Sequence, residues 1–191
     1  MTIYSRVLGV ALAGMTAVGA LAVITGNAQA NPPAEPSGGR AASFHGGSID
    51  LTNGWGEAQS CVVFGPSDTR CYGTHAEADT VLGYSRATDP LVNDAARQGL
   101  DPAVIPACAS GWLCLFEHTN GRGRRLIFND EYFHWLDDWG FSRKTSSWRN
   151  NQGSRDGGTL RSPVYGDYNC SPNTYASQMG EYNDKAELVH G

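Results

Sequence analysis

From Ile105 to its C-terminus the chain repeats one pattern, a short strand-forming stretch followed by a turn rich in Gly, Asn or Asp. "GWLCLFEH" has an apolar centre, "TNGRG" supplies the Asn-Gly pair of a tight hairpin, and "RRLIFND" is predicted to be the returning strand. Further strands are predicted at "SSWRNN" and "GTLRSPVYGDY", and compact irregular structure at "EYFHWLDDWGF". Such short strands and frequent turns favour an antiparallel sandwich or Greek-key barrel, so residues 104–191 are predicted to form a mainly β domain.

The first 50 residues are predicted to lie outside any folded core. Arg6 precedes an uncharged and mostly apolar run, and "AQA" at residues 28–30 matches a small-x-small cleavage site. Residues 1–30 are therefore expected to be a signal peptide and the protein to be secreted and extracellular. The alternative is an uncleaved membrane anchor, since the uncharged run is nearly long enough to span a bilayer. Residues 31–50 are rich in Pro, Gly, Ala and Ser, which predicts a flexible linker.

Residues 51–103 are predicted to form a small α+β module. "CVVFGPSDTRCY" has the pattern of two short strands around a turn. Thr74 and Glu77 form a capping box at the start of a short helix, and a second helix is expected from about Leu91 to Gln98. A module of about 50 residues is marginal for an independent core. It is therefore expected to pack on the C-terminal β domain or to depend on a disulfide.

Five cysteines in an exported chain predict disulfides. Their spacing offers two short-range pairs, Cys61 with Cys71 and Cys108 with Cys114. Cys170 is left over and is expected to be free, buried or intermolecular.

Charge and motif content restrict the function. The chain has 14 Lys and Arg against 19 Asp and Glu, and the net charge of −5 argues against nucleic acid or anionic lipid as a partner. A local cluster at Arg122, Arg124 and Arg125 is interpreted as a solvated hairpin.

The sequence contains no nucleophile elbow, zinc-protease helix, Cys-x-x-Cys pair or phosphate-binding loop, and its five histidines are scattered singly. No catalytic residue is therefore assigned. We expect a monomeric non-enzyme that has no membrane attachment once the signal peptide is removed.

Three features between residues 108 and 153 resemble a known family. Cys108 and Cys114 open the first strand with a Cys-x5-Cys spacing, Gly123 follows Phe116 by seven residues, and "KTSSWRNN" follows a Gly-Phe pair. Together they resemble peptidase inhibitor family I36, secreted actinobacterial proteins related to the streptomycete metalloproteinase inhibitor. The resemblance implies a βγ-crystallin-like Greek-key fold for residues 104–191. Seven aromatic residues of this region are interpreted as core or corner residues, with an exposed aromatic binding face as the alternative: Trp112, Phe116, Phe128, Trp135, Trp139, Phe141 and Trp148.

The same resemblance implies a function. The protein would be a secreted inhibitor that places a rigid, substrate-like loop in the cleft of an extracellular zinc metalloprotease of the thermolysin type, and the zinc would belong to the protease. Inhibitors of this group carry a second short disulfide loop beside the bond offered to the protease, where this chain has only Cys170. The candidate loop has Cys170, Ser171 and Pro172 at its tip, and an ordinary surface turn is the alternative. Its residues are Tyr168, Asn169, Cys170, Ser171 and Pro172.

A βγ-crystallin-like fold also raises the question of calcium. Calcium-binding members carry an arch of two Asp or Asn residues, two free positions, a Ser or Thr, and a Ser. The arch at residues 142–147 keeps the hydroxyl half but has Arg143 in its acidic half, and the arch at 183–188 keeps only the acidic half. A cation beside Ca²⁺ is repulsive.

In that family each ion is shared between the two arches. One weak Ca²⁺ site is therefore expected at Ser146, Asn183 and Asp184, while the other position would hold an Arg143–Glu187 ion pair. The alternative is two purely structural corners. No other cofactor is expected. The alternative function is a non-inhibitory βγ-crystallin-type binding or structural module.

Overall fold

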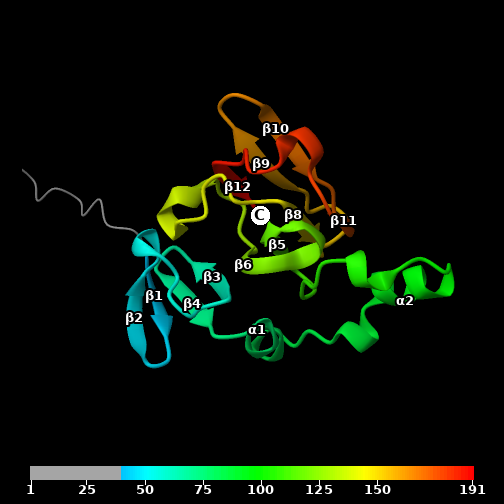
Figure 1. The fold of residues 1–191 in the computed structure, drawn as a ribbon, viewed down its shortest axis with the longest axis horizontal. Coiled ribbons are helices and arrows are strands. Elements are labelled where there is room, and N and C mark those ends of the chain that lie inside the picture. The colour runs from blue at the N-terminus through cyan, green and yellow to red at the C-terminus, as the bar shows by residue number, and fades with distance from the viewer. Residues whose placement is uncertain (1–39) are drawn as a thin grey trace, which may run out of the picture. The chain divides into compact units, whose positions relative to one another are not determined.

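The computed structural model describes residues 40–191, which all fall within one compact unit. Within them, twelve strands form two sheets, joined by two short α-helices and several 3-10 turns (Figure 1). The predicted mainly β class is confirmed. The predicted signal peptide and residues 31–39 of the predicted linker lie outside the described residues.

The larger sheet has the strand order β11-β8-β5-β6-β3-β4-β1-β2. Its strands are β1 (Ala41–Phe44), β2 (Gly47–Asp50), β3 (Ser60–Gly65), β4 (Asp68–Tyr72), β5 (Leu113–His118), β6 (Arg122–Phe128), β8 (Ser147–Asn150) and β11 (Thr174–Ala176). The smaller sheet has the order β10-β9-β12-β7. Its strands are β7 (His134–Trp135), β9 (Gly158–Ser162), β10 (Gly166–Cys170) and β12 (Leu188–His190). Neighbouring strands are antiparallel except for β3 with β6 and β1 with β4.

The two helices are α1 (His75–Val81) and α2 (Pro90–Arg97). Thr74 is confirmed as the N-cap of α1, because the amide of Glu77 donates to Thr74 Oγ1. The return bond of the predicted capping box is displaced by one residue, since the Glu77 carboxylate accepts from the amide of Gly73 and not from that of Thr74. The 3-10 turns are η1 (Leu51–Asn53), η2 (Arg86–Thr88), η3 (Pro102–Val104), η4 (Thr119–Gly121), η5 (Leu136–Trp139) and η6 (Gly180–Tyr182). None of the helices in residues 40–191 is long and apolar enough to cross a membrane.

The strand β5 is buried on both faces. Leu113 and Leu115 belong to the apolar cluster that also contains Leu160 and Val189 of the smaller sheet, so this cluster fills the space between the sheets. Cys114 and Phe116, which alternate with the two leucines, belong to a second cluster under α1. Full burial of a Leu or Phe side chain contributes about 1.5–3 kcal/mol relative to leaving it exposed. The "LCLF" stretch is therefore the centre of a three-layer arrangement of small sheet, large sheet and α1.

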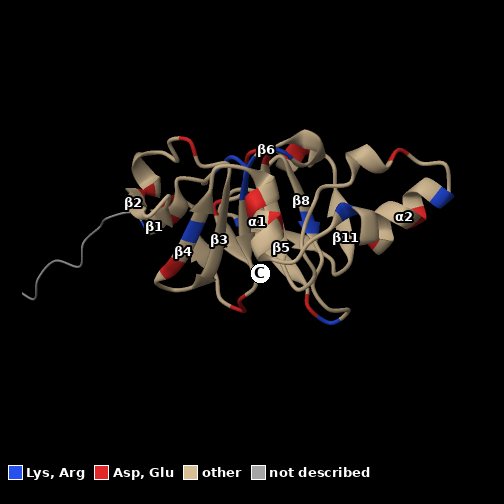
Figure 2. Ribbon diagram, turned by 90° about the horizontal axis from the view of Figure 1, so that it is seen from below, with Lys and Arg blue, Asp and Glu red and all other residues tan. Residues whose placement is uncertain are grey.

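The interpretation of the basic cluster as a solvated hairpin is wrong for Arg125. Its side chain is fully buried beside α1, which lies across the larger sheet (Figure 2). The guanidinium forms an ion pair with Asp79 at 2.8 Å and donates to Ser60 Oγ and to the carbonyls of His75 and Ala107. A buried charge is tolerated only when it is paired and hydrogen-bonded, as it is here.

The hairpin of β1 and β2 shows that the predicted flexible linker is wrong from Ala41 onward. The two strands pair from Ala41–Asp50 to Phe44–Gly47. A parallel bridge between Ser43 and Arg70 joins β1 to β4. Ala42 is 2% exposed within the main core. Composition misled the prediction because the few apolar residues of this hairpin, Ala42, Phe44 and Ile49, pack on a core that is formed mostly by later strands.

The predicted module at 51–103 and the predicted domain at 104–191 lie in the same compact unit. The strand β3 pairs with β6 in parallel, and the carboxylate of buried Asp89 at the start of α2 accepts from both terminal nitrogens of Arg149 in β8. Burial alone would raise the pKa of Asp89, but the hydrogen bonds and charge of Arg149 outweigh it and lower that pKa.

The aromatic segment after β6 is compact and largely irregular, as predicted. It contains only the two-residue strand β7 and the turn η5. Trp139 and Phe141 are buried as expected, whereas Trp135 is 54% exposed and is not a core residue. Trp135 belongs to the edge strand of the smaller sheet, where its neighbour Leu188 covers one side only.

Candidate functional site

Two loops meet beside the smaller sheet, the first arch at residues 142–147 and the second arch at residues 183–188. The amide of Arg143 donates to the carbonyl of Ala186 at 2.8 Å, and the amide of Asp184 donates to the carbonyl of Thr145 at 3.0 Å. Arg143 and Asp184 hold the same position in their arches, and both have φ of 56°. The two arches are therefore joined by one reciprocal pair of backbone hydrogen bonds.

The structure brings together the three residues of the candidate calcium site. Ser146 Oγ donates to Asp184 Oδ1 at 3.0 Å, and Asn183 Nδ2 donates to Asp184 Oδ2 at 2.7 Å. Both carboxylate oxygens thus already have a hydrogen-bond partner. Among residues 40–191 no group of three His, Cys, Asp or Glu is arranged to hold a metal ion. Ca²⁺ takes six to eight oxygen ligands, so these three residues would supply only part of a shell.

The equivalent position on the other side of the arches holds the expected ion pair. Arg143 Nε and Nη2 lie 2.8 and 2.5 Å from Glu187 Oε1, which confirms the Arg143–Glu187 pairing. The arginine side chain is 66% exposed and that of Glu187 only 16%. The guanidinium therefore remains accessible to solvent while its partner is largely covered.

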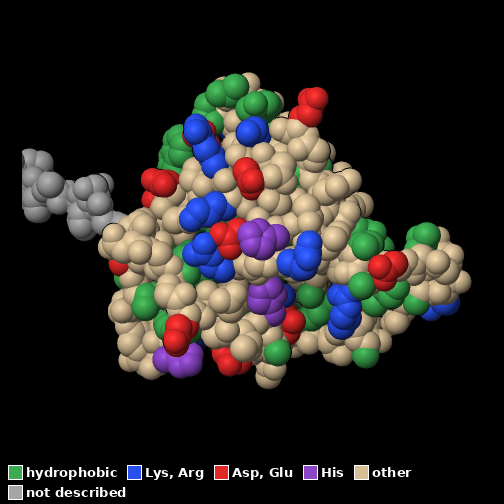
Figure 3. Space-filling model, viewed as in Figure 1, with side chains coloured by type: hydrophobic (Ala, Val, Ile, Leu, Met, Phe, Trp, Pro, Cys, Tyr) green, Lys and Arg blue, Asp and Glu red, His purple; other side chains and the backbone are tan. Residues whose placement is uncertain are grey.

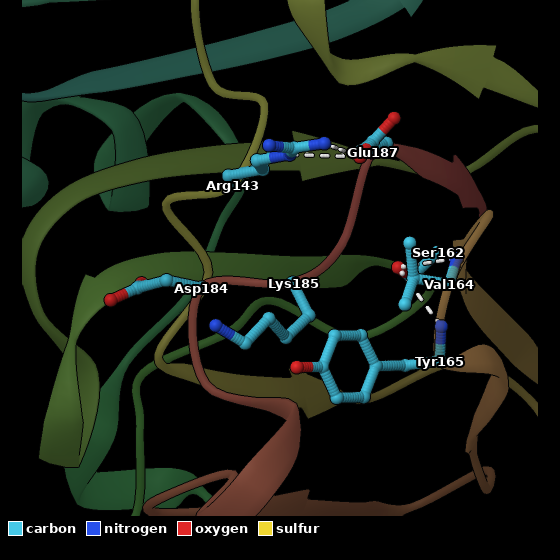
Figure 4. Close-up of a pocket in the computed structure, with 7 residues that line it drawn as sticks. All are labelled: Arg143, Ser162, Val164, Tyr165, Asp184, Lys185 and Glu187. Atoms are coloured by element: carbon cyan, nitrogen blue, oxygen red, sulfur yellow. Dashed lines mark hydrogen bonds and ion pairs between the residues drawn. The ribbon is translucent and has the colours of Figure 1, made fainter.

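A pocket of about 270 Å³ lies between the arches and the β9–β10 hairpin (Figure 4). Its lining combines two cations, two carboxylates and the end of the hairpin: Arg143, Ser162, Val164, Tyr165, Asp184, Lys185 and Glu187. Lys185 Nζ lies 5.5 Å from the centroid of the Tyr165 ring, within the range of a cation–π contact.

The tip of the β9–β10 hairpin, defined as residues 163–165, exposes two large apolar side chains. Val164 is 79% exposed and Tyr165 is 53% exposed. The tip is also ordered by hydrogen bonds, because Ser162 Oγ accepts from the amides of Val164 and Tyr165 at 3.4 and 3.3 Å. Hydrophobic side chains gather on the surface over this end of the molecule (Figure 3).

Two further contacts brace the hairpin directly behind its tip. Arg161 Nε and Nη2 lie 2.6 and 2.9 Å from the two carboxylate oxygens of Asp167, across the β9–β10 ladder. The Tyr182 hydroxyl donates to the carbonyl of Gly166 at 2.8 Å. Burial raises the pKa of Tyr182 to about 12, so this hydroxyl stays protonated at neutral pH. The tip is thus held in one conformation by strand pairing, an ion pair and a tyrosine donor.

The structure does not place the candidate loop of residues 168–172 as expected. Tyr168, Asn169 and Cys170 form the end of β10, and Cys170 is fully buried in the core opposite Gly158. Cys170 therefore cannot stand at the tip of a presented loop, and only Ser171 and Asn173 are exposed in the turn after β10. Of the states left open for Cys170, the structure has it free and buried, and burial raises the pKa of its thiol.

The two disulfides are the short-range pairs expected from the cysteine spacing. Cys61–Cys71 joins directly opposite residues of β3 and β4, and Cys108–Cys114 closes the loop that leads into β5. By restricting the unfolded chain, each is worth on the order of 2–4 kcal/mol.

A second exposed apolar surface lies beside the smaller sheet. Tyr132, Phe133 and Trp135 are 71%, 41% and 54% exposed, and the Arg161 guanidinium carbon lies 4.2 Å from the centroid of the Phe133 ring. Of the seven aromatic residues named from the sequence, Trp135 is the one that belongs to this surface.

A comparison with protein families finds a match for the part of the chain that contains the hairpin tip and the first arch. Residues 102–177 match peptidase inhibitor family I36. The match confirms the resemblance found at residues 108–153, and it supports a peptidase inhibitor rather than an enzyme. No match was found among curated proteins or among solved structures.

The segment matched to family I36 covers less than half of the chain and runs from η3 through β11. It includes the first arch and the hairpin tip, whereas the second arch lies beyond it. The family and the two disulfides are compatible with secretion.

Sequence analysis missed Val164 and Tyr165, the exposed apolar pair at the hairpin tip within the segment matched to family I36. A signal for them exists in "RSPVYGD", where Pro163 and Gly166 flank two bulky apolar residues between two strands. Apolar residues in a turn have no strand neighbours to cover them, so this pattern indicates exposure.

Proposed function

We propose that the protein inhibits a secreted zinc metalloprotease of the thermolysin type by placing the hairpin tip in the substrate cleft of the protease. The observation that carries the proposal is the pair of exposed apolar side chains, Val164 and Tyr165, on a braced turn within the I36 segment. The zinc belongs to the protease.

The energetics of binding favour such a tip. Association costs free energy when a loop must be ordered, and a loop that is already ordered avoids that cost. Val164 and Tyr165 also expose apolar surface that would be covered by a partner. Behind the tip, the ladder from Gly166–Ser162 to Cys170–Gly158 would keep both sides of a cleaved bond in place. Hydrolysis would then be unproductive, because the new ends remain in the cleft.

The proposal predicts that inhibition depends on Val164. Wild-type protein is expected to inhibit a thermolysin-like protease with a nanomolar Ki, and Val164→Asp is expected to weaken Ki at least ~100-fold by introducing a charge into an apolar subsite. The matched control is Ser171→Asp, which puts the same charge on the exposed turn after β10. It is expected to change Ki less than about threefold. The Ki values of both variants and of the wild type are measured against a panel of secreted metalloproteases.

Three outcomes would count against this assignment. No inhibition by wild-type protein at micromolar concentration would reject the inhibitory function against these enzymes. Loss of inhibition by Ser171→Asp with Val164→Asp unaffected would place the reactive segment at residues 168–172. Inhibition of serine proteases alone would reject the metalloprotease class. Because Val164 is 79% exposed, the melting temperature of Val164→Asp should match that of the wild type.

A second candidate function is a weak Ca²⁺ site at the arches, favoured by the 3.0 Å contact between Ser146 and Asp184. Ca²⁺ at millimolar concentration is then expected to raise the melting temperature, and Asp184→Ala to abolish the rise. Calorimetry without a heat of binding at millimolar Ca²⁺ would eliminate this candidate and leave two structural corners.

A further inference from the structure

We infer that the pocket beside the hairpin tip is a subsite for a carboxylate, with Lys185 as its receiving cation. The inference rests on the proposed function in one respect, since the carboxylate would come from an Asp or Glu side chain of the protease that binds the tip.

The position of the pocket ties it to the tip. Val164 and Tyr165 form part of its wall, so a protease that covers these two residues also covers the mouth of the pocket. A volume of about 270 Å³ is sufficient for one side chain of the partner. Three tip residues bury much less than the roughly 800 Å² per partner of a stable inhibitor complex, so neighbouring surface must take part.

The charges in the pocket are not equally available. Arg143 is paired with Glu187, and both oxygens of Asp184 accept hydrogen bonds from Ser146 and Asn183. Within residues 40–191, by contrast, no carboxylate lies within 4 Å of Lys185 Nζ. Lys185 is therefore the cation of the pocket that has no paired carboxylate, while the carboxylate of Asp184 is bound by the neutral donors Ser146 and Asn183.

The surroundings of Lys185 suit a carboxylate. Its ammonium group and the hydroxyl of Tyr165 extend on the same side of the pocket, and the Tyr165 ring holds the ammonium by a cation–π contact (Figure 4). A carboxylate accepts hydrogen bonds at two oxygens, so one ammonium and one phenol hydroxyl can serve it together. The exposed guanidinium of Arg143 adds positive potential at the mouth, whereas the carboxylate of Glu187 is largely covered.

A contact of this kind would act mainly on the rate of association. Opposite charges on two partners steer their encounter, and salt screens the effect over about 8–10 Å. The chain as a whole carries a net charge of −5. Without a local cation beside the tip, an acidic protease rim would be repelled.

The test uses the full-length protein with Lys185→Glu and the matched control Arg155→Glu. Arg155 is exposed and does not line the pocket, so the control makes the same charge change elsewhere. The partner is a metalloprotease that the wild-type protein has been found to inhibit. Its association rate with each variant is measured by stopped flow between about 50 and 500 mM NaCl. Lys185→Glu is expected to slow association about tenfold at low salt and to flatten the salt dependence, while Arg155→Glu stays within about twofold of wild type. Equal effects of the two variants would overturn the subsite.

If wild-type protein inhibits no metalloprotease, the proposed function fails and a second measurement decides the subsite alone. The isolated protein is titrated with sodium acetate against sodium chloride while NMR shifts of Lys185 and Tyr165 are followed. The inference expects a saturable, acetate-specific shift that Lys185→Gln removes. Absence of that shift in wild-type protein, or its persistence in Lys185→Gln, would overturn the inference.

Discussion

Gly140, at the end of η5, shows how strictly a single position can be specified. Its φ is +57°, a region where L-residues with a Cβ are strained, and a Cβ added there would lie 2.4 Å from the carbonyl oxygen of Leu51. The close approach packs η5 against η1, beside the indole of Trp55, which donates to the carbonyl of Trp139 at 2.7 Å. Conformation and space thus both require glycine.

Gly140→Ala is therefore expected to cost about 3 kcal/mol or more, because it combines left-handed strain of ~1–2 kcal/mol with a backbone clash. Gly180→Ala is the matched control, since Gly180 has a φ of +55° but nothing within 4 Å of an added Cβ. The control should cost only about 1 kcal/mol. Chemical denaturation of both variants measures the difference. Equal losses would show that the contact with Leu51 is not rigid.

Single residues also differ in how well they were predicted. The Arg143–Glu187 pair was predicted because two sequence patterns could be aligned with each other, position by position. The burial of Arg125 was not predicted, because its partner Asp79 belongs to α1 and its strand neighbour Ser60 belongs to β3. A run of arginines looks the same whether or not another strand covers it.

At the level of elements, β1 is the clearest case in which composition predicts one structure, a linker, and the fold has another, a strand. If Ala41–Phe44 were a linker, charged substitutions would be tolerated at each position. In the structure, Ala42 is buried in the main core and Ser43 beside it is exposed.

Ala42→Asp is accordingly expected to lower the free energy of unfolding by about 3 kcal/mol or more, because it buries an unpaired carboxylate. Ser43→Asp, one residue away on the other face, should change it by less than about 0.5 kcal/mol. Thermal unfolding followed by circular dichroism compares the two, at roughly 2–4 °C per kcal/mol for a domain of this size. A tolerated Ala42→Asp would restore the linker interpretation.

Elements with local signals were predicted well. The Asn-Gly turn between β5 and β6 and the N-cap Thr74 of α1 each depend on residues within a few positions of one another. The hairpin tip had a local signal too, but the proposed role of the tip in inhibition depends on the exposure of its side chains. That exposure follows from the position of the turn beyond the ends of β9 and of β10, which is an edge strand of the smaller sheet.

At the scale of the whole molecule, three long-range connections decide the architecture. The parallel pairing of β3 with β6 extends the larger sheet beyond the I36 segment, the Asp89–Arg149 pair fixes the start of α2 to β8, and the reciprocal bonds of the arches join residues 143 and 184. Because of the last connection, Lys185 lies beside the hairpin tip although the I36 segment ends at residue 177. The proposed inhibitory surface therefore combines matched and unmatched parts of the chain.

The amino-acid sequence alone was sufficient for the mainly β class, the resemblance to family I36, both disulfide pairs, the start of α1 and the pairing of Arg143 with Glu187. All of these depend on spacing between nearby residues or on a pattern that can be aligned. The burial of Arg125 and Cys170, the folding of residues 41–50 and the exposure of Val164 depended on the tertiary structure. Burial is a property of what covers a residue, and the covering strands here come from segments separated by tens of residues. Strand pairing over such distances is chosen by the total burial and hydrogen bonding of the fold, which no local pattern records.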